Sequence, residues 1–146
     1  MKNIINCIKN ISESSNQNLK NKSIKIYEKS FFKGRISRSG EGSDLIQTKK
    51  IRPTIPKIIE KYQTKTFLDA PYGNWYWMKK VILDSVQYIG VDIVEDLIKN
   101  NTKNFSNMSH SFLSLNIKQN LLLKSNLILC KDCLVHLSFR DSIKMI

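Results

Sequence analysis

The spacing of apolar and polar residues changes near residue 66. From there on, short apolar runs of strand length alternate with segments whose apolar residues recur at helical spacing. The runs predict strands over Thr66–Ala70, Val86–Asp92, Ser111–Leu115 and Asn126–Lys131, and helices over residues 74–83, 94–104 and from about Ser138. Alternating strands and helices are typical of parallel sheets with right-handed crossovers. Because the strands are continuous apolar runs, we predict a mostly parallel sheet with helices on both faces.

The segment before residue 66 is less regular. A glycine turn leads into a stretch whose apolar residues recur at helical spacing, and Ser43 or Asp44 is suited to cap a helix there. Pro53 and Pro56 interrupt this stretch. We therefore expect either a kinked helix or two short helices.

The domain boundary is expected near residue 36. Residues 1–36 combine one amphipathic helical segment with a Ser-, Asn- and Lys-rich stretch, which predicts a helical, partly disordered extension. Residues 37–146 form the α/β domain, and the sequence stops within the last predicted helix. A sheet of four strands would leave Leu127–Cys130 as a bare edge, so we expect a domain that is incomplete at its C-terminus.

Composition narrows the possible partners. The 146 residues carry a net charge of +12, and residues 1–65 hold 15 of the 24 basic side chains but only 5 of the 12 acidic ones. Such a basic front is suited to nucleic acid or anionic lipid, but lysine dominates it, and an excess of solvated lysines is the better explanation. No apolar run approaches the roughly 18 residues of a membrane span, and no secretory signal is present. Three cysteines without a framework spacing fit a reducing cytoplasm.

Two of the predicted strands end in an acid. Asp69 ends the first and opens into a turn at Gly73, and Asp92 ends the second, 19 residues beyond that glycine. An acid at this position is suited to the hydroxyls of a ribose. A dinucleotide site needs further glycines around its pyrophosphate, but Trp75 and Trp77 follow here. The pattern therefore favours S-adenosylmethionine, which has no phosphates, over NAD.

Several motifs together resemble the class I S-adenosylmethionine-dependent methyltransferases, and most of all a bacterial subgroup of them. The motifs are Leu68-Asp69-Ala70-Pro71 with Gly73, Trp77-Met78, Tyr88–Val94 and Leu129–Ser138, preceded by Ser39–Ser43 with Gln47-Thr48. The resemblance covers residues 37 to the end. It implies a Rossmann-like methyltransferase fold with seven strands, truncated here after the fourth strand.

The resemblance also implies roles for individual residues. Asp69 and Gly73 would lie near the methionine end of the cofactor, and Asp92 would hold the ribose hydroxyls. Asn116 occupies the position beside the adenine amino group, where the family usually carries an acid. Tyr72 is a second departure, since the subgroup commonly has a small residue or cysteine there. The remaining cofactor contacts would come from Pro71, Trp77, Ile93 and Lys131.

The resemblance places the substrate after the fourth strand, at Asp132. His136 is suited to take a proton from the acceptor, because imidazole titrates near neutrality. It could equally pack against or cap the last helix. Cys130-x-x-Cys133-x-x-His136 looks like a set of metal ligands, but zinc needs four ligands or three with water, so we expect no metal.

Three other side chains have two interpretations each. Asp69 could contact the cofactor or only cap the next helix. Trp75 and Trp77 could shape the lip of a pocket or belong to the core.

We therefore predict methyl transfer from S-adenosylmethionine to an unidentified acceptor, a small molecule by preference, in a cytoplasmic protein. Two alternatives remain open: a non-catalytic module that binds S-adenosylmethionine, and an RNA methyltransferase that uses the basic N-terminal region. The sequence does not indicate the oligomeric state.

Overall fold

The fold is an α/β arrangement built on a sheet of four parallel strands, seen in a computed structural model that describes residues 21, 41–117 and 122–145. The strands are β1 (Thr66–Asp69), β2 (Gln87–Asp92), β3 (His110–Ser114) and β4 (Leu127–Leu129). All four predicted strands are confirmed, although β4 is shorter than expected. The topology is compatible with a Rossmann-like fold.

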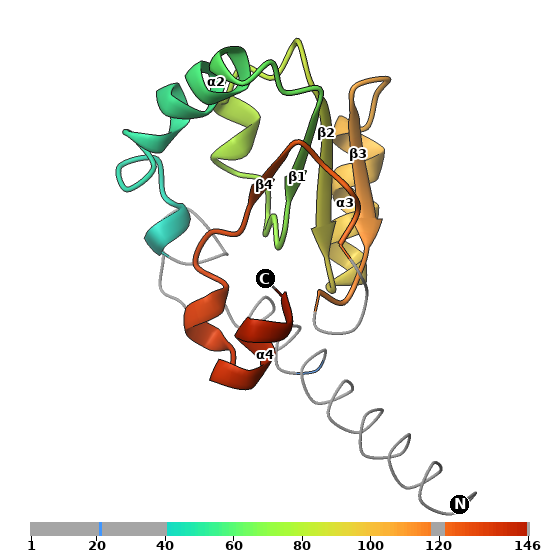
Figure 1. The fold of residues 1–146 in the computed structure, drawn as a ribbon. Coiled ribbons are helices and arrows are strands. Elements are labelled where there is room, and N and C mark those ends of the chain that lie inside the picture. The colour runs from blue at the N-terminus through green and yellow to red at the C-terminus, as the bar shows by residue number, and fades with distance from the viewer. Residues whose placement is uncertain (1–20, 22–40, 118–121, 146) are drawn as a thin grey trace, which may run out of the picture.

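The order of the strands across the sheet is β3-β2-β1-β4. The chain builds outward from β1 to β3 and then returns to the other side of β1 to add β4, so the order reverses between β1 and β4 (Figure 1). In open α/β sheets, ligands bind beyond the carboxyl ends of the strands at such a switch point. The carboxyl ends of β1, β2 and β4 are therefore the place to look for a site.

Two of the predicted helices are confirmed. Helix α3 (Glu95–Phe105) follows β2, and α4 (Phe139–Met145) follows a short 3₁₀ turn, η3 (Leu134–His136). Glu95 and Asp96 lie in the first turn of α3, where the positive end of the helix dipole stabilises negative charge. Leu97 and Ile98 form the buried side of α3.

The predicted helix over residues 74–83 is wrong. The crossover from β1 to β2 contains only the 3₁₀ turn η2 (Met78–Lys80). Trp75 has a φ of 54°, a left-handed conformation that an α-helix does not accommodate. Because Trp75, Trp77, Met78, Val81 and Leu83 are all buried, the crossover lies against the sheet without forming a single apolar stripe.

The predicted helix start at Ser43 or Asp44 is also wrong. A 3₁₀ turn, η1 (Glu41–Ser43), and further turns precede α2 (Ile51–Lys61), whose N-cap position, Lys50, makes no capping bond from its side chain. Helix α2 continues through both prolines, so two short helices do not form. Pro53 is tolerated because it lies in the first turn, where a backbone N–H has no helical partner.

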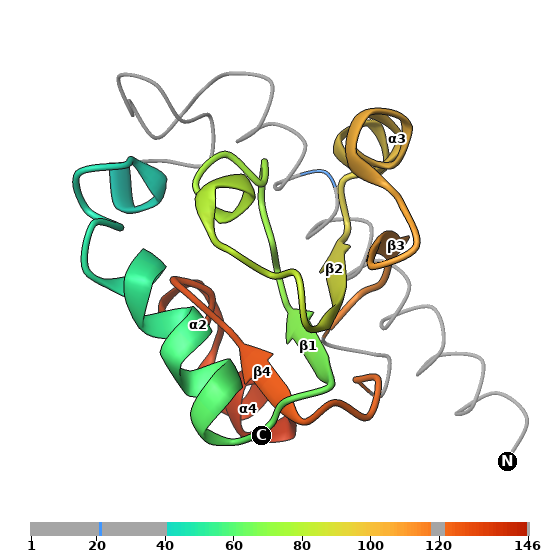
Figure 2. The same cartoon turned by 90° about the horizontal axis from the view of Figure 1, so that it is seen from above.

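The two faces of the sheet are covered differently. One face presents Phe67, Tyr88 and Phe112 to a core that includes the buried side chains of α2, α3 and the β1–β2 crossover. These three segments lie on the same side of the sheet (Figure 2). The other face buries a smaller cluster of Leu68, Ala70 and Val91, which packs against the connection between β3 and β4. In residues 41–117 and 122–145, helices therefore pack on one face of the sheet rather than on both as predicted.

Strand β4 is an edge strand within the described part of the chain. It pairs with β1 alone, and Ile128 at its centre is 48% exposed. This agrees with the bare edge predicted from the sequence. The extension predicted over residues 1–36 lies outside the described residues, apart from Asn21.

Among the helices that the structure describes, none combines the length and the apolar character needed to cross a membrane.

Candidate functional site

Asp69 and Asp92 lie on the same face and at the same end of the sheet. Asp69 pairs in register with Gly90, and Asp92 stands two residues further along β2. Since side chains alternate between faces, this spacing directs both carboxyls to the helix-covered face. Their exposed fractions are only 2% and 7%. Two acids that are 23 positions apart in the chain thus form a buried pair at the carboxyl ends of neighbouring strands.

Asp92 is held by three backbone N–H groups. Its Oδ1 accepts from Ile93 at 2.7 Å and from Val94 at 3.1 Å, and its Oδ2 accepts from Gly73 at 3.1 Å. Gly73 has a φ of 64°, which suits glycine and lets the turn after β1 direct its N–H at this carboxylate. A carboxylate offers about four acceptor positions, so one position on Oδ2 has no donor among the described residues.

Burial raises the pKa of Asp92, and the three N–H bonds offset part of that effect. Burial also acts on the pKa of Asp69. Burial raises the pKa of Asp69 from 3.8 to about 7, the Tyr88 hydroxyl lowers it, Asp92 raises it, and Lys131 lowers it. Asp69 therefore changes its protonation state near neutral pH.

Tyr88 is a site residue that the sequence analysis missed. Its hydroxyl donates to Asp69 Oδ2 at 2.8 Å, and both side chains are buried. A tyrosine inside an otherwise apolar strand was the available signal, because a buried hydroxyl needs a partner.

Gly90, directly opposite Asp69, was missed as well. A Cβ at this position would lie 3.0 Å from the ring of Tyr72 and 3.1 Å from that of Phe112. The glycine thus allows the Tyr72 ring to pack closely on the sheet, where it contacts Phe112 at 5.2 Å between ring centroids. Glycine in the interior of a strand often marks a close approach of this kind.

The tip of β4 is much more open. Lys131 Nζ donates to the carbonyl of Gly42 at 2.8 Å and forms an ion pair with Asp132. Asp132 has a left-handed φ of 55°, and its side chain is 60% exposed. A Cβ on Gly42 would lie 2.5 Å from Asp132 Oδ2. The turn around Gly42 therefore lies directly on the tip of β4, although Gly42 and Lys131 are 89 residues apart in sequence.

The other predicted residues occupy varied positions. His136 is exposed on η3, and Asn116 is half-buried just after β3. Pro71 is half-buried and follows a cis peptide bond. Trp75 and Trp77 both belong to the core, and Trp75 also lines a hollow at the far end of the sheet.

Cys130 and Cys133 are free thiols just beyond β4. Burial raises the pKa of both, that of Cys133 to about 12, so neither is a thiolate at neutral pH. In the part of the chain that the structure describes, no three His, Cys, Asp or Glu side chains gather in a way that could hold a metal ion.

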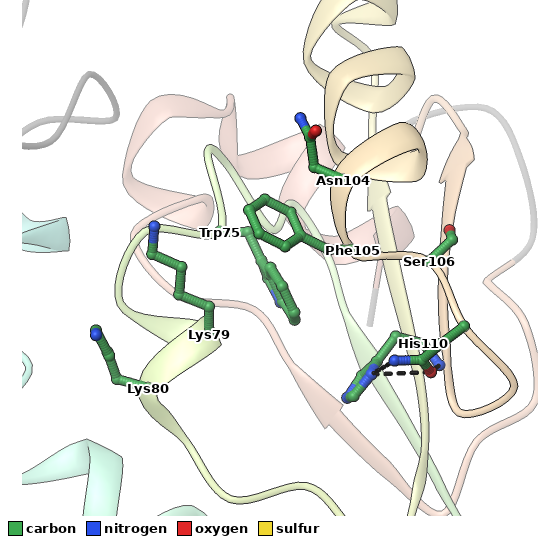
Figure 3. Close-up of a pocket in the computed structure, with 8 residues that line it drawn as sticks. Trp75, Lys79, Lys80, Asn104, Phe105, Ser106 and His110 are labelled. Atoms are coloured by element: carbon green, nitrogen blue, oxygen red, sulfur yellow. Dashed lines mark hydrogen bonds between the residues drawn. The ribbon is translucent and has the colours of Figure 1, made fainter.

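A hollow of about 550 Å³ lies at the other end of the sheet (Figure 3). It is lined by the end of α3, the loop between α3 and β3, the start of β3 and the β1–β2 crossover, including Trp75, Lys79, Lys80, Phe105 and His110. None of the site residues predicted from the sequence lines it. The hollow and the two buried acids are therefore separate features.

No protein-family model and no curated protein matches this chain. The assignment of a function therefore depends on the residues and their geometry.

Proposed function

We propose that this chain binds S-adenosylmethionine and transfers its methyl group to a small-molecule acceptor. One observation carries the proposal: Asp69 and Asp92 are buried on one face, at the carboxyl ends of neighbouring parallel strands, with the Gly73 turn bonded to Asp92. This is the end of the sheet at which α/β proteins bind nucleosides.

The chemistry of the two acids suits different parts of this ligand. The remaining acceptor position on Asp92 Oδ2 is suited to a ribose hydroxyl, because a carboxylate accepts strong hydrogen bonds from neutral donors. The ionised form of Asp69 is suited to an ammonium or sulfonium, since an opposite charge compensates for its burial. The two requirements, a diol and a nearby cation, are met together in S-adenosylmethionine.

The crossover after β1 argues against a dinucleotide. A pyrophosphate is usually received by the N-terminus of a helix that begins directly after the glycine turn. Here Gly73 is followed by irregular chain and then by the three-residue turn η2. Without a helix dipole at this point, a ligand that lacks phosphates is the better match.

The acceptor would bind at the open tip of β4. When bound, S-adenosylmethionine would supply an electrophilic methyl group, and its sulfur would keep the electron pair of the bond that breaks. Alignment supplies most of the rate gain in such an in-line displacement. Asp132 would orient the acceptor, and His136 would take the proton that the acceptor loses.

Calorimetry tests the binding step with one matched pair of variants. Asp92→Asn keeps the size of the side chain but cannot accept all of its bonds, whereas Asp96→Asn removes one exposed acid from the first turn of α3. We expect S-adenosylmethionine to bind the wild type and Asp96→Asn equally and Asp92→Asn at least about tenfold more weakly. NAD should give no heat. Equal binding by Asp92→Asn, with its fold intact by circular dichroism, would contradict the proposal.

A second candidate is a module that binds S-adenosylmethionine without turnover. It is favoured by Asn116, an amide where the resembling family usually carries an acid, and by the exposure of His136. An assay with methyl-labelled S-adenosylmethionine and a panel of amines, phenols and thiols separates the two. Labelled product favours the enzyme, and binding without product favours the module.

A further inference from the structure

Tyr88 and Asp69 form a buried pair on neighbouring strands. The hydroxyl of Tyr88 lies 2.8 Å from Asp69 Oδ2, and the exposed fraction of Tyr88 is 1%. Four aromatic rings surround that of Tyr88, with centroid distances of 5.6 Å to Phe67, 5.8 Å to Trp75, 5.9 Å to His110 and 6.1 Å to Phe112. The ring therefore has little freedom to turn the hydroxyl away from the carboxyl.

Few other charged groups reach Asp69. On β2 the neighbour is Asp92, a like charge that favours the protonated form of Asp69. Beyond β4 the neighbours are Lys131, which favours the ionised form and is paired with Asp132, and the thiol of Cys130. None of these groups donates a hydrogen bond to Asp69 among the described residues, so Tyr88 is its direct partner there.

From this geometry we infer that Tyr88 is a positioning residue for Asp69. Asp69 in turn releases its proton when the cationic end of the ligand binds beside it. This inference rests on the proposed function and adds a residue and a proton to it. When the cation arrives, Asp69 loses its proton to the buffer and keeps the hydrogen bond from Tyr88. The Tyr88 hydroxyl remains protonated throughout, because burial and the nearby acid raise the pKa of Tyr88 well above 10.0.

The role of the hydroxyl follows from its direction of donation. An O–H that donates to a carboxylate stabilises the ionised form more than the neutral acid. Removal of the hydroxyl should therefore keep Asp69 protonated to higher pH. Without the hydroxyl, the affinity for a cation should therefore fall more at low pH than at high pH. A simple loss of packing would instead lower the affinity equally at every pH.

The first test needs no ligand. Carbon-13 NMR of labelled aspartate side chains follows the titration of Asp69 in the wild type, in Tyr88→Phe and in the exposed control Tyr62→Phe. We expect a midpoint near 7 in the wild type and in the control. In Tyr88→Phe we expect the midpoint to rise by about one pH unit, the equivalent of one charge-assisted hydrogen bond. An unchanged midpoint in a folded Tyr88→Phe would overturn the role of Tyr88.

The second test adds S-adenosylmethionine. If the midpoint rises by one unit, Tyr88→Phe should bind about tenfold more weakly than the wild type at pH 6 and about twofold more weakly at pH 8. Asp69→Asn should bind weakly with no dependence on pH over that range. A constant loss at both pH values would reduce Tyr88 to a packing residue. Absence of binding by the wild type would instead contradict the proposed function, while the NMR titration would still decide whether Tyr88 controls Asp69.

Discussion

The carboxyl end of the sheet contains two tips of opposite character. The β1–β2 tip, formed by Asp69 and Asp92, is buried, and its acids are bonded to groups of the protein itself, including the Tyr88 hydroxyl. The β4 tip, formed by Lys131 and Asp132, is partly open, and its acid is paired with the lysine. Similar side chains thus have different properties because only one tip is removed from water.

The difference has consequences for chemistry. Burial makes the β1–β2 tip selective, since a buried acid accepts only a ligand that supplies the missing charge or hydrogen bond. Exposure makes the β4 tip adaptable, because an exposed ion pair contributes little and rearranges at little cost. We therefore assign recognition of the cofactor to the first tip and contact with the acceptor to the second, as parts of the proposed function.

The largest expected effect concerns pH and Asp69. Its pKa is raised from 3.8 to about 7, so the unfolded chain loses this proton first as pH rises, while the native state retains it. The contribution of Asp69 to stability is therefore full below about pH 4 and is lost by about pH 7 to 8, a change of about 4 kcal/mol.

Asp69→Asn should remove this dependence. Denaturant unfolding at pH 5 and pH 8 should show the variant close to the wild type at the lower pH and more stable at the higher one. Asp132→Asn, at the β4 tip, should retain the slope of the wild type. A wild-type stability that rises between pH 5 and 8 and does not depend on Asp69 would contradict this prediction.

The next effect is the loss of the acceptor on Asp92. Asp92→Ala leaves the N–H groups of Gly73, Ile93 and Val94 without their acceptor, which should lower the free energy of unfolding by about 3 kcal/mol. Asp132→Ala at the open tip should change it by less than about 0.5 kcal/mol. Urea unfolding at pH 7 measures both. Similar losses in the two variants would remove the contrast between the tips.

Two glycines offer a matched comparison of steric freedom. Gly90→Ala forces a methyl group against two buried rings and should cost about 2 kcal/mol. Gly42→Ala meets the ends of two side chains, the exposed carboxylate of Asp132 and, at 3.4 Å, Lys131 Nζ. Both ends can swing away, so we expect a loss of less than about 1 kcal/mol. Thermal unfolding of the two variants tests this order, and a larger loss in Gly42→Ala would reverse it.

The smallest effect on stability is expected at His136. Because this side chain is exposed on η3, His136→Ala should change stability by less than about 0.5 kcal/mol and leave binding of S-adenosylmethionine unchanged. If His136 is the base, turnover should fall by about 10²-fold or more. A variant that transfers methyl groups at the rate of the wild type would show that alignment alone suffices.

The sequence predicted the elements whose signal is local. All four strands, α3 and α4 were found from apolar runs and helical spacing. The crossover after Gly73 was not, because the φ of Trp75 depends on how its ring packs against Tyr88, Phe105 and Phe112, which are distant in sequence.

The site was predicted to a similar extent. Asp69, Gly73 and Asp92 were selected as candidates from strand ends and turn chemistry, and the structure brings Gly73 and Asp92 into contact. Tyr88 and Gly90 carry only a weak local signal, a tyrosine and a glycine within an apolar strand, and their partners across the sheet are not contained in it. The contact of Gly42 with Lys131 joins two segments that are distant in sequence and that only the fold brings together.

The most direct measurement is an amide NMR spectrum recorded as S-adenosylmethionine is added to the labelled protein. The proposal predicts the largest shifts at the N–H groups of Gly73, Ile93 and Val94, the three donors to Asp92. Shifts confined to the hollow around Lys80 and His110, or no shifts at millimolar ligand, would contradict it.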